Sequence, residues 1–152
     1  MIQQRLVLAI NQGMVLDHIP AGQALKIMRL LHVVSDQQRI TLGLNLASQR
    51  LTLKDLIKIE NRLLTEEEFH QVSIFAPEAT LNYIENFKIS KKVRCQLPKR
   101  IHGIFICPNN NCISHGEGQT AFQVESALKT VMLSCVYCER RFERDQLVKN
   151  YL

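Results

Sequence analysis

The sequence Cys107-Pro108-Asn109-Asn110-Asn111-Cys112, followed by Cys135-Val136-Tyr137-Cys138, decides how the last third of the chain folds. Each pair of cysteines brackets a turn that aims two sulfurs at one point, and residues 113–134 form a loop long enough to bring the pairs together. Soft thiolates favour zinc, with an iron–sulfur centre as the alternative. The spacing therefore predicts one Zn²⁺ per chain, which is structural because four protein ligands leave no open position for a substrate.

Two alternatives remain open around this motif. His115 lies close to Cys112 and could replace one of the ligands, and the four cysteines could instead pair as disulfides. Disulfides are rare in the reducing cytoplasm, where we expect the chain because its first residues lack the layout of a secretory signal. Cys95 is left over as a free thiol. Metal binding and folding of so small a domain are one equilibrium, so chelation should unfold it.

The composition predicts a globular protein with one ordinary domain or two small ones. The 152 residues are 46% hydrophobic and 22% charged, with no tryptophan. No apolar run approaches the roughly 20 residues of a membrane span, so no membrane partner is expected. The formal charge of +5 permits binding to nucleotides, nucleic acid or an acidic protein surface, and does not choose among them.

The segments before residue 85 have the patterns of short strands and two amphipathic helices. The patterns predict strands at 6–10, 14–19, 40–46, 51–59 and 80–84, and helices at about 21–33 and 65–76. Thr65 and Glu68 have the spacing of a capping box. In the strand at 40–46, alternation predicts one half-buried face, formed by Ile40, Leu42, Leu44 and Leu46. From residue 14 the order is strand, helix, two strands, helix, strand, which predicts an α+β fold with a ferredoxin-like split βαβ domain and both helices on one face of the sheet.

A basic stretch from Lys88 to Arg100, which contains Pro98, has the pattern of a linker or hinge. We therefore expect one domain at residues 1–97 and a smaller, β-rich zinc domain at residues 98–152. Short β-type runs at 104–106 and 130–133 would supply the strands of this second domain.

No catalytic constellation is visible in the sequence. Asp17 and His18 are adjacent, but neighbours on a strand point to opposite faces, so a catalytic dyad would require the strand to break there. There is no nucleophile elbow, phosphate-binding glycine loop or HExxH motif. The chain is therefore not expected to be an enzyme. From the residues alone, a zinc-ribbon protein that binds nucleic acid remains the rival interpretation.

Several motifs taken together resemble a known family, the regulatory chain of aspartate carbamoyltransferase. The resemblance covers nearly the whole chain, in the same order, and rests on Asp17-His18-Ile19-Pro20, residues 39–46, residues 54–61, Ala76-Pro77, residues 107–115 and residues 135–139. It implies a non-catalytic subunit with a nucleotide-binding allosteric domain and a zinc domain that docks on the catalytic chain. It also implies a regulatory-chain homodimer, a dodecamer of two catalytic trimers and three regulatory dimers, and no nucleic-acid partner. In that family CTP inhibits and ATP activates at one shared site, which controls pyrimidine biosynthesis.

The resemblance further implies which residues of this chain bind the nucleotide. Carried onto matching positions, the base would lie against Val7, Ala9 and Ile10. Asp17 and Lys58 would hold the ribose region, and His18 and Lys92 would meet the phosphates. The wall of the site would be completed by Asn82, Ile84, Phe87 and Ile89.

Overall fold

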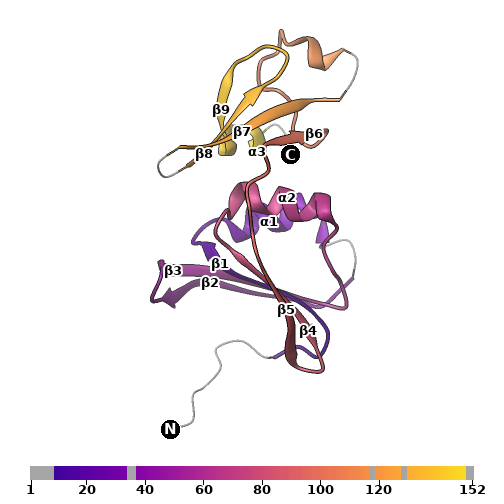
Figure 1. Ribbon diagram of the computed structural model, residues 1–152, viewed down its shortest axis with the longest axis vertical. Helices are drawn as coiled ribbons and strands as arrows, with labels where there is room; N and C mark the ends of the chain where they lie inside the picture. The colour runs from indigo at the N-terminus through magenta and orange to yellow at the C-terminus, as the bar shows by residue number, and fades with distance from the viewer. Residues whose placement is uncertain (1–8, 34–36, 117–118, 128–129, 150–152) are drawn as a thin grey trace.

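Two antiparallel sheets, with two helices packed between them, make up the fold (Figure 1). The computed structural model describes residues 9–33, 37–116, 119–127 and 130–149. The first sheet has the strand order β2-β3-β1-β4-β5, with β1 (Gly13–Pro20), β2 (Ile40–Ser48), β3 (Thr52–Glu60), β4 (Thr80–Glu85) and β5 (Lys88–Arg94). The helices are α1 (Ala24–Leu30) and α2 (Glu66–Phe75).

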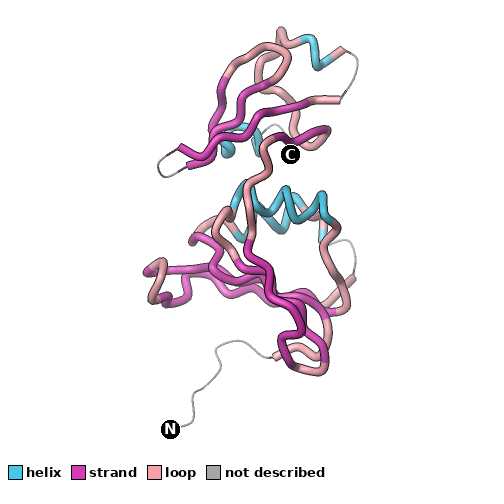
Figure 2. Tube along the Cα trace, viewed as in Figure 1, coloured by secondary structure: helices cyan, strands magenta, loops and turns pink. Residues whose placement is uncertain are grey.

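The first sheet confirms the predicted split βαβ arrangement. Strand β3 lies between β1 and β2 and is antiparallel to both, while β4 pairs with the other side of β1. Both helices lie on the same face of the sheet, the face turned toward the second sheet (Figure 2). Side chains alternate along each strand, so Met14, Leu16, Ile57 and Leu81 point to the helices and are completely buried.

Gly13 fixes where β1 begins. Its φ is +139°, and a Cβ at this position would overlap the carbonyl oxygen of Ile59 on the neighbouring strand. Only glycine tolerates both the backbone conformation and this close approach. The strand predicted at 6–10 is not seen in its described part, because Ala9 and Ile10 are not in a strand, and its other residues lie outside the described ranges.

Helix α2 begins and ends close to where the sequence predicts it. Thr65 caps α2, because its hydroxyl accepts from Glu68 N–H at 3.2 Å while the Glu68 carboxylate accepts from Thr65 N–H at 3.0 Å. This capping box is confirmed. Helix α1 is shorter than predicted, since a turn closed by a hydrogen bond from Gln23 N–H to Pro20 O precedes it.

Two predictions for the first sheet are wrong. The basic segment expected to begin a linker at Lys88 instead forms β5, whose cationic side chains are exposed because β5 is an edge strand. In β2, a bulge between Gly43 and Leu46, with Asn45 at a φ of 56°, breaks the alternation. Of the four side chains predicted to be half-buried, Leu42 and Leu44 are instead 37% and 45% exposed, while Ile40 packs partly against the core.

The second sheet has the order β6-β7-β8-β9, with β6 (Arg100–His102), β7 (Ala121–Ala127), β8 (Thr130–Cys135) and β9 (Arg141–Glu143). A short 3-10 helix, η2 (Ile113–His115), and α3 (Arg144–Lys149) complete this part, hereafter the cysteine module. The strand predicted at 130–133 is confirmed. The one predicted at 104–106 is wrong, because Ile104 and Phe105 are consecutive and both buried, which an alternating strand facing one core does not allow.

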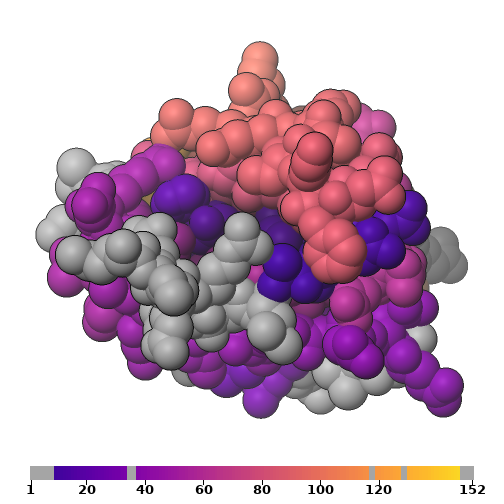
Figure 3. All heavy atoms as spheres, turned by 90° about the horizontal axis from the view of Figure 1, so that it is seen from below, coloured from indigo at the N-terminus to yellow at the C-terminus, as the bar shows by residue number. Residues whose placement is uncertain are grey.

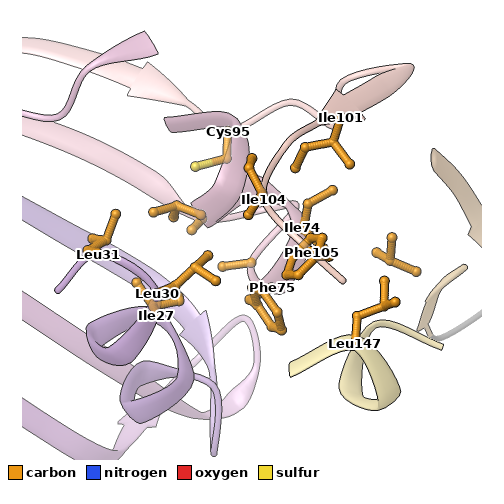
Figure 4. Packing of buried hydrophobic residues seen from close by; sticks show 14 of the residues in the cluster. Ile27, Leu30, Leu31, Ile74, Phe75, Cys95, Ile101, Ile104, Phe105 and Leu147 are labelled. Atoms are coloured by element: carbon orange, nitrogen blue, oxygen red, sulfur yellow. The ribbon is translucent and has the colours of Figure 1, made fainter. Parts of the chain in front are cut away.

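A continuous apolar core joins the helices to the cysteine module (Figure 4). The Phe105 ring lies between those of Phe75 and Phe122, with centroid separations of 6.3 Å and 6.5 Å. Leu147 from α3 is completely buried in the same cluster. Across the described ranges, no helix is long and apolar enough to cross a membrane.

Candidate functional site

Four cysteine sulfurs converge at one end of the cysteine module. The Sγ atoms of Cys107 and Cys138 are 3.7 Å apart, as are those of Cys112 and Cys135, and all four lie within 4.8 Å of one another. Zinc bound tetrahedrally at about 2.3 Å from each sulfur would separate the sulfurs by roughly 3.8 Å. A disulfide would need about 2.05 Å. The spacing of the sulfurs thus fits one structural zinc ion and not a pair of disulfides.

Local turns hold the four cysteines in place. Asn109 shapes the first turn, since its carbonyl accepts from Cys112 N–H at 3.0 Å and its side-chain oxygen accepts from Asn111 N–H at 3.2 Å. The second turn closes at the end of β8, where Glu139 N–H donates to Cys135 O at 2.9 Å and Glu139 has a φ of 62°. Both turns are formed by residues between or next to the cysteines, which is why the sequence predicts this site well.

The protein surroundings alter how easily the thiols ionise. Burial opposes ionisation of Cys112, but hydrogen bonds from the Ser114 hydroxyl, at 3.1 Å, from the Ser114 backbone and from the neighbouring cysteines together outweigh burial and lower the pKa to about 6. Burial raises the pKa of Cys107, and the nearby sulfur of Cys138 raises it further. A divalent cation takes the place of the thiol protons, because the ligand is the thiolate.

Neither His115, the alternative ligand, nor Cys95, the left-over thiol, belongs to this cluster. The His115 Nε2 atom lies 2.9 Å from Asn109 O, so the ring supports the first cysteine turn. Cys95 follows β5 and is 3% exposed, and burial raises the pKa of its thiol to about 11. Within the described residues, the one metal-ligand cluster consists of the four paired cysteines.

A second group of predicted site residues lies on the face of the first sheet opposite the helices, here called the helix-free face. Strand register places Lys58, Val15, Asn82 and Lys92 side by side in one row across β3, β1, β4 and β5. Paired residues point to the same face, which is not the face of the buried Leu16, Ile57 and Leu81. Residues from four strands, far apart in the sequence, are therefore brought together.

Asn82 is the least exposed member of this row, at 8%. Its Oδ1 atom is buried and finds no hydrogen-bond partner in the part of the chain that the structure describes. Buried polar atoms are nearly always satisfied by protein, water or ligand. An unpaired acceptor at the centre of a row that includes two lysines is thus a feature that a ligand with a hydrogen-bond donor would satisfy.

The strand does break between Asp17 and His18, but no catalytic dyad results. The register of the pairing between β1 and β3 changes between Leu16 and Ile19, and His18 has a φ of 58°. The Asp17 carboxylate binds Lys54 Nζ at 2.8 Å and accepts from the backbone N–H of His18 at 2.7 Å, while His18 Nδ1 lies 3.3 Å from the Thr80 hydroxyl. The bulge therefore turns the imidazole toward β4 and not toward the carboxylate.

Neighbouring charges set the ionisation of both groups. Burial works against ionisation of Asp17, but the hydrogen bond to Lys54 and the one from His18 N–H outweigh it and lower the pKa of the carboxyl. Burial lowers the pKa of the His18 imidazole, and the cations Lys54, Arg50 and Lys92 lower it further, against the opposing effect of Asp17. Three cations, Lys54, Arg50 and Lys92, therefore lie near enough to His18 to act on its ionisation.

The remaining predicted site residues lie toward the β4–β5 turn. Ile84 is paired with Ile89 across this hairpin, and Phe87 at its tip is 64% exposed. Phe87 N–H donates to Asn11 O at 3.1 Å, which holds the turn against the segment that contains the exposed Ala9 and the buried Ile10. Figure 3 views the molecule from this side, with the hairpin in coral beside the indigo start of the described chain. Val7 lies outside the described residues.

Two cavities in the described part of the chain each reach one of these residues. One cavity of about 680 Å³ includes Ile84 but is otherwise lined by residues such as Arg62, Tyr83 and Lys91. A cavity of about 430 Å³ is lined by His18 together with residues of the cysteine module. Each of these two cavities therefore includes only one of the candidate nucleotide residues.

Asp55 is an important residue whose role the sequence did not reveal. It is 1% exposed, and its carboxylate accepts from Gly22 N–H at 2.9 Å, Ala24 N–H at 3.2 Å and Asn45 N–H at 3.0 Å. It thereby ties the start of α1 and the bulge of β2 to β3. Its three donors are distant in the chain, and only its central place in an apolar strand could have drawn attention to it.

Comparison with known proteins gives matches over nearly the whole chain. Residues 5–96 match the family described as "Aspartate carbamoyltransferase regulatory chain, allosteric domain", and residues 99–148 match the corresponding "metal binding domain". A protein of Tolumonas auensis named as an aspartate carbamoyltransferase regulatory chain is 50% identical over 144 residues, which is 94% of each chain. A protein of the same name from Aeromonas hydrophila is 48% identical over 149 residues, 97% of each chain. The Chromobacterium violaceum protein of that name is 48% identical over 142 residues, 93% of each chain.

Proposed function

Because the chain belongs to the aspartate carbamoyltransferase regulatory chain family, whose members are non-catalytic subunits with allosteric and metal-binding domains, we propose that it controls the activity of a catalytic partner in response to nucleotides. Residues 1–97 bind CTP as inhibitor and ATP as activator at one shared site on the helix-free face. Residues 98–152 bind zinc and dock on the catalytic chain. The assembled enzyme contains two catalytic trimers and three regulatory dimers, so the end product of pyrimidine biosynthesis controls its first committed step.

The row Lys58–Val15–Asn82–Lys92 is the observation that carries the nucleotide proposal. Lys92 supplies a point charge for the phosphate groups, Lys58 holds the ribose region, and the unpaired Asn82 Oδ1 accepts a hydrogen bond from the nucleotide. Asp17 and His18 follow Val15 on β1. His18 lies near cations, whose charge suits a triphosphate. Because CTP and ATP both require this row, they compete for it.

Apolar side chains at the other end of the face suit a nucleobase. Ile84 is 9% exposed and lies beside Ile89, which is 58% exposed and available to cover a ligand. Ile10 and Phe87 flank the same turn. A base held against these groups places its sugar and phosphates over the lysines, so the face has an apolar end and a cationic end in the order that a nucleotide requires.

Exposed apolar side chains next to the metal cluster support the docking role. Ile106 and Ile113 flank the first two cysteines and are 48% and 76% exposed, and Val136 and Tyr137, between the last two, are 37% and 48% exposed. Large apolar side chains gathered at one end of a small module favour contact with another protein. The metal holds the turns that present them, so docking depends on zinc.

The outer edge of β2 supports the homodimer. This strand ends the sheet order, so its outward backbone groups have no neighbouring strand among the described residues. Leu42 and Leu44 are exposed beside that edge, and an uncovered apolar edge strand readily pairs with another strand. A Leu44→Lys variant should sediment as a monomer while the wild-type chain sediments as a dimer; a wild-type monomer would contradict the homodimer.

A titration of CTP into the zinc-loaded chain, followed by calorimetry, tests the nucleotide site. Lys92→Met should weaken CTP binding about tenfold or more, because it removes a charge-assisted contact. Lys91→Met is the matched control, since Lys91 pairs with Tyr83 and points to the opposite face of the same strand. Saturating ATP should displace CTP. Equal effects of the two substitutions, or CTP binding that ATP leaves unchanged, would contradict a shared site on the helix-free face.

A further inference from the structure

Arg144, the first residue of α3, reaches out of the cysteine module into the helical layer of the other sheet. It is 9% exposed, and its Nη1 donates to the carbonyl oxygens of Ile74 at 3.0 Å and Phe75 at 3.2 Å. Its guanidinium carbon lies 6.0 Å from the centre of the Phe75 ring. One cation from the end of the chain is thus buried against the end of α2.

The two carbonyls belong to the last turn of α2, where carbonyl groups have no partner within the helix. The last backbone hydrogen bond of α2 runs from Ala76 N–H to Val72 O at 2.9 Å, and Pro77 follows Ala76 in the sequence. Burying a guanidinium is costly unless it is well paired. Here Nη1 satisfies two carbonyls at the point where the chain leaves the helix, while the buried Nε has no hydrogen-bond partner among the described residues.

The segment that leaves α2 leads directly to the helix-free face. Ala79 N–H donates to Ala76 O at 3.1 Å, and Cys95 N–H donates to Ala79 O at 2.8 Å, which anchors the segment before β4 begins at Thr80. The Thr80 hydroxyl then contacts the His18 ring at 3.3 Å. His18, Pro77 and Arg144 also line one cavity of about 430 Å³ between the sheets.

We propose that Arg144 is a positioning residue that couples the cysteine module to the nucleotide site, by holding the Ala76–Ala79 connection that places Thr80 against His18. The coupling rests on the proposed function, because His18 is one of the proposed phosphate contacts. A shift of the cysteine module on the catalytic chain moves Arg144 and changes the position of His18. By linkage, a nucleotide at His18 alters the hold of Arg144 on α2 by the same free energy.

The apolar core around Phe75 and Phe105 keeps the module attached when Arg144 is changed (Figure 4). Substitution at Arg144 therefore loosens the connection locally and leaves the two sheets together. Arg141 is the matched control, because it lies on β9 in the same module and its pair with Glu125 is about half exposed, with side chains 56% and 51% accessible.

Hydrogen exchange on the full zinc-loaded chain, read at the Ala76 and Ala79 amides, tests this directly. In Arg144→Met, exchange at these amides should be about tenfold faster, since the helix end loses two charge-assisted hydrogen bonds. Zinc content should be unchanged, and CTP should bind about threefold or more weakly. Arg144→Lys should give intermediate values, and Arg141→Met should match the wild type.

Unchanged exchange in Arg144→Met, or faster exchange with unchanged CTP affinity, would overturn the coupling. If Arg144→Met does not fold, the wild-type chain still tests the coupling. Saturating CTP should slow hydrogen exchange at the Ala76 and Ala79 amides, and an unchanged exchange rate would overturn the proposal. If the wild-type chain does not bind CTP, the proposed function fails together with the coupling to it, whereas a failure of the exchange prediction alone leaves CTP binding standing.

Discussion

Replacing Asp55 by alanine should destabilise the first sheet more than the loss of any surface charge. The substitution leaves the backbone N–H groups of Gly22, Ala24 and Asn45 without their acceptor. A hydrogen bond to a charged group contributes about 1.5–3 kcal/mol, and the three bonds are not additive, so we expect a loss of about 3–5 kcal/mol. That is a large fraction of the roughly 5–15 kcal/mol by which domains are stable.

Thermal unfolding followed by circular dichroism, with zinc in the buffer, provides the assay. The expected loss corresponds to a Tm lower by about 10–15 °C for a chain of this size. Glu125→Ala is the control, because its pair with Arg141 is exposed and should contribute at most about 1 kcal/mol. A loss below about 1 kcal/mol for Asp55→Ala would refute the view that this carboxylate organises α1 and the bulge of β2.

Three further predictions follow from local features. Thr65→Ala removes the α2 capping box and should cost about 1 kcal/mol in the free energy of unfolding, measured by urea titration. The His18 ring should titrate below its ordinary pKa of about 6.5 in an NMR titration, because burial and nearby cations disfavour its charged form; the stability this linkage provides is present above pH 6.5 and is lost as the pH falls through the lowered pKa. A midpoint at or above 6.5 would contradict this electrostatic picture. Chelation of zinc, or Cys138→Ser, should unfold the cysteine module, seen as loss of its β-sheet signal together with zinc release; a zinc-free module that keeps its fold would show that the metal is not structural.

Sequence reasoning succeeded where the determinants are close together in the chain. The four cysteines lie in two short turns, and the Thr65–Glu68 capping box spans a single helical turn, so both could be predicted from spacing. The order of strands and helices also followed from hydrophobic periodicity, because one face of the sheet packs against the helices. Each of these features is determined by residues that are close together in the sequence.

The missed features depend on contacts between distant segments. A cationic run such as β5 resembles a linker until its pairing with β4 is known, because edge strands carry charge. The carboxylate of Asp55 binds backbone groups 10 to 33 residues away, which no local pattern reveals. Arg144 reaches α2 across about half the chain, with its acceptors 69 and 70 residues earlier.

The most direct test of the central claim is the rate of carbamoyl aspartate formation by the holoenzyme reconstituted from this chain and its catalytic partner. With wild-type chain, CTP should lower the rate at subsaturating aspartate and ATP should raise it. In Lys92→Met both responses should need about tenfold more nucleotide, whereas Lys91→Met should respond as the wild type does. A holoenzyme that assembles but whose rate neither nucleotide changes would contradict a regulatory role for the helix-free face.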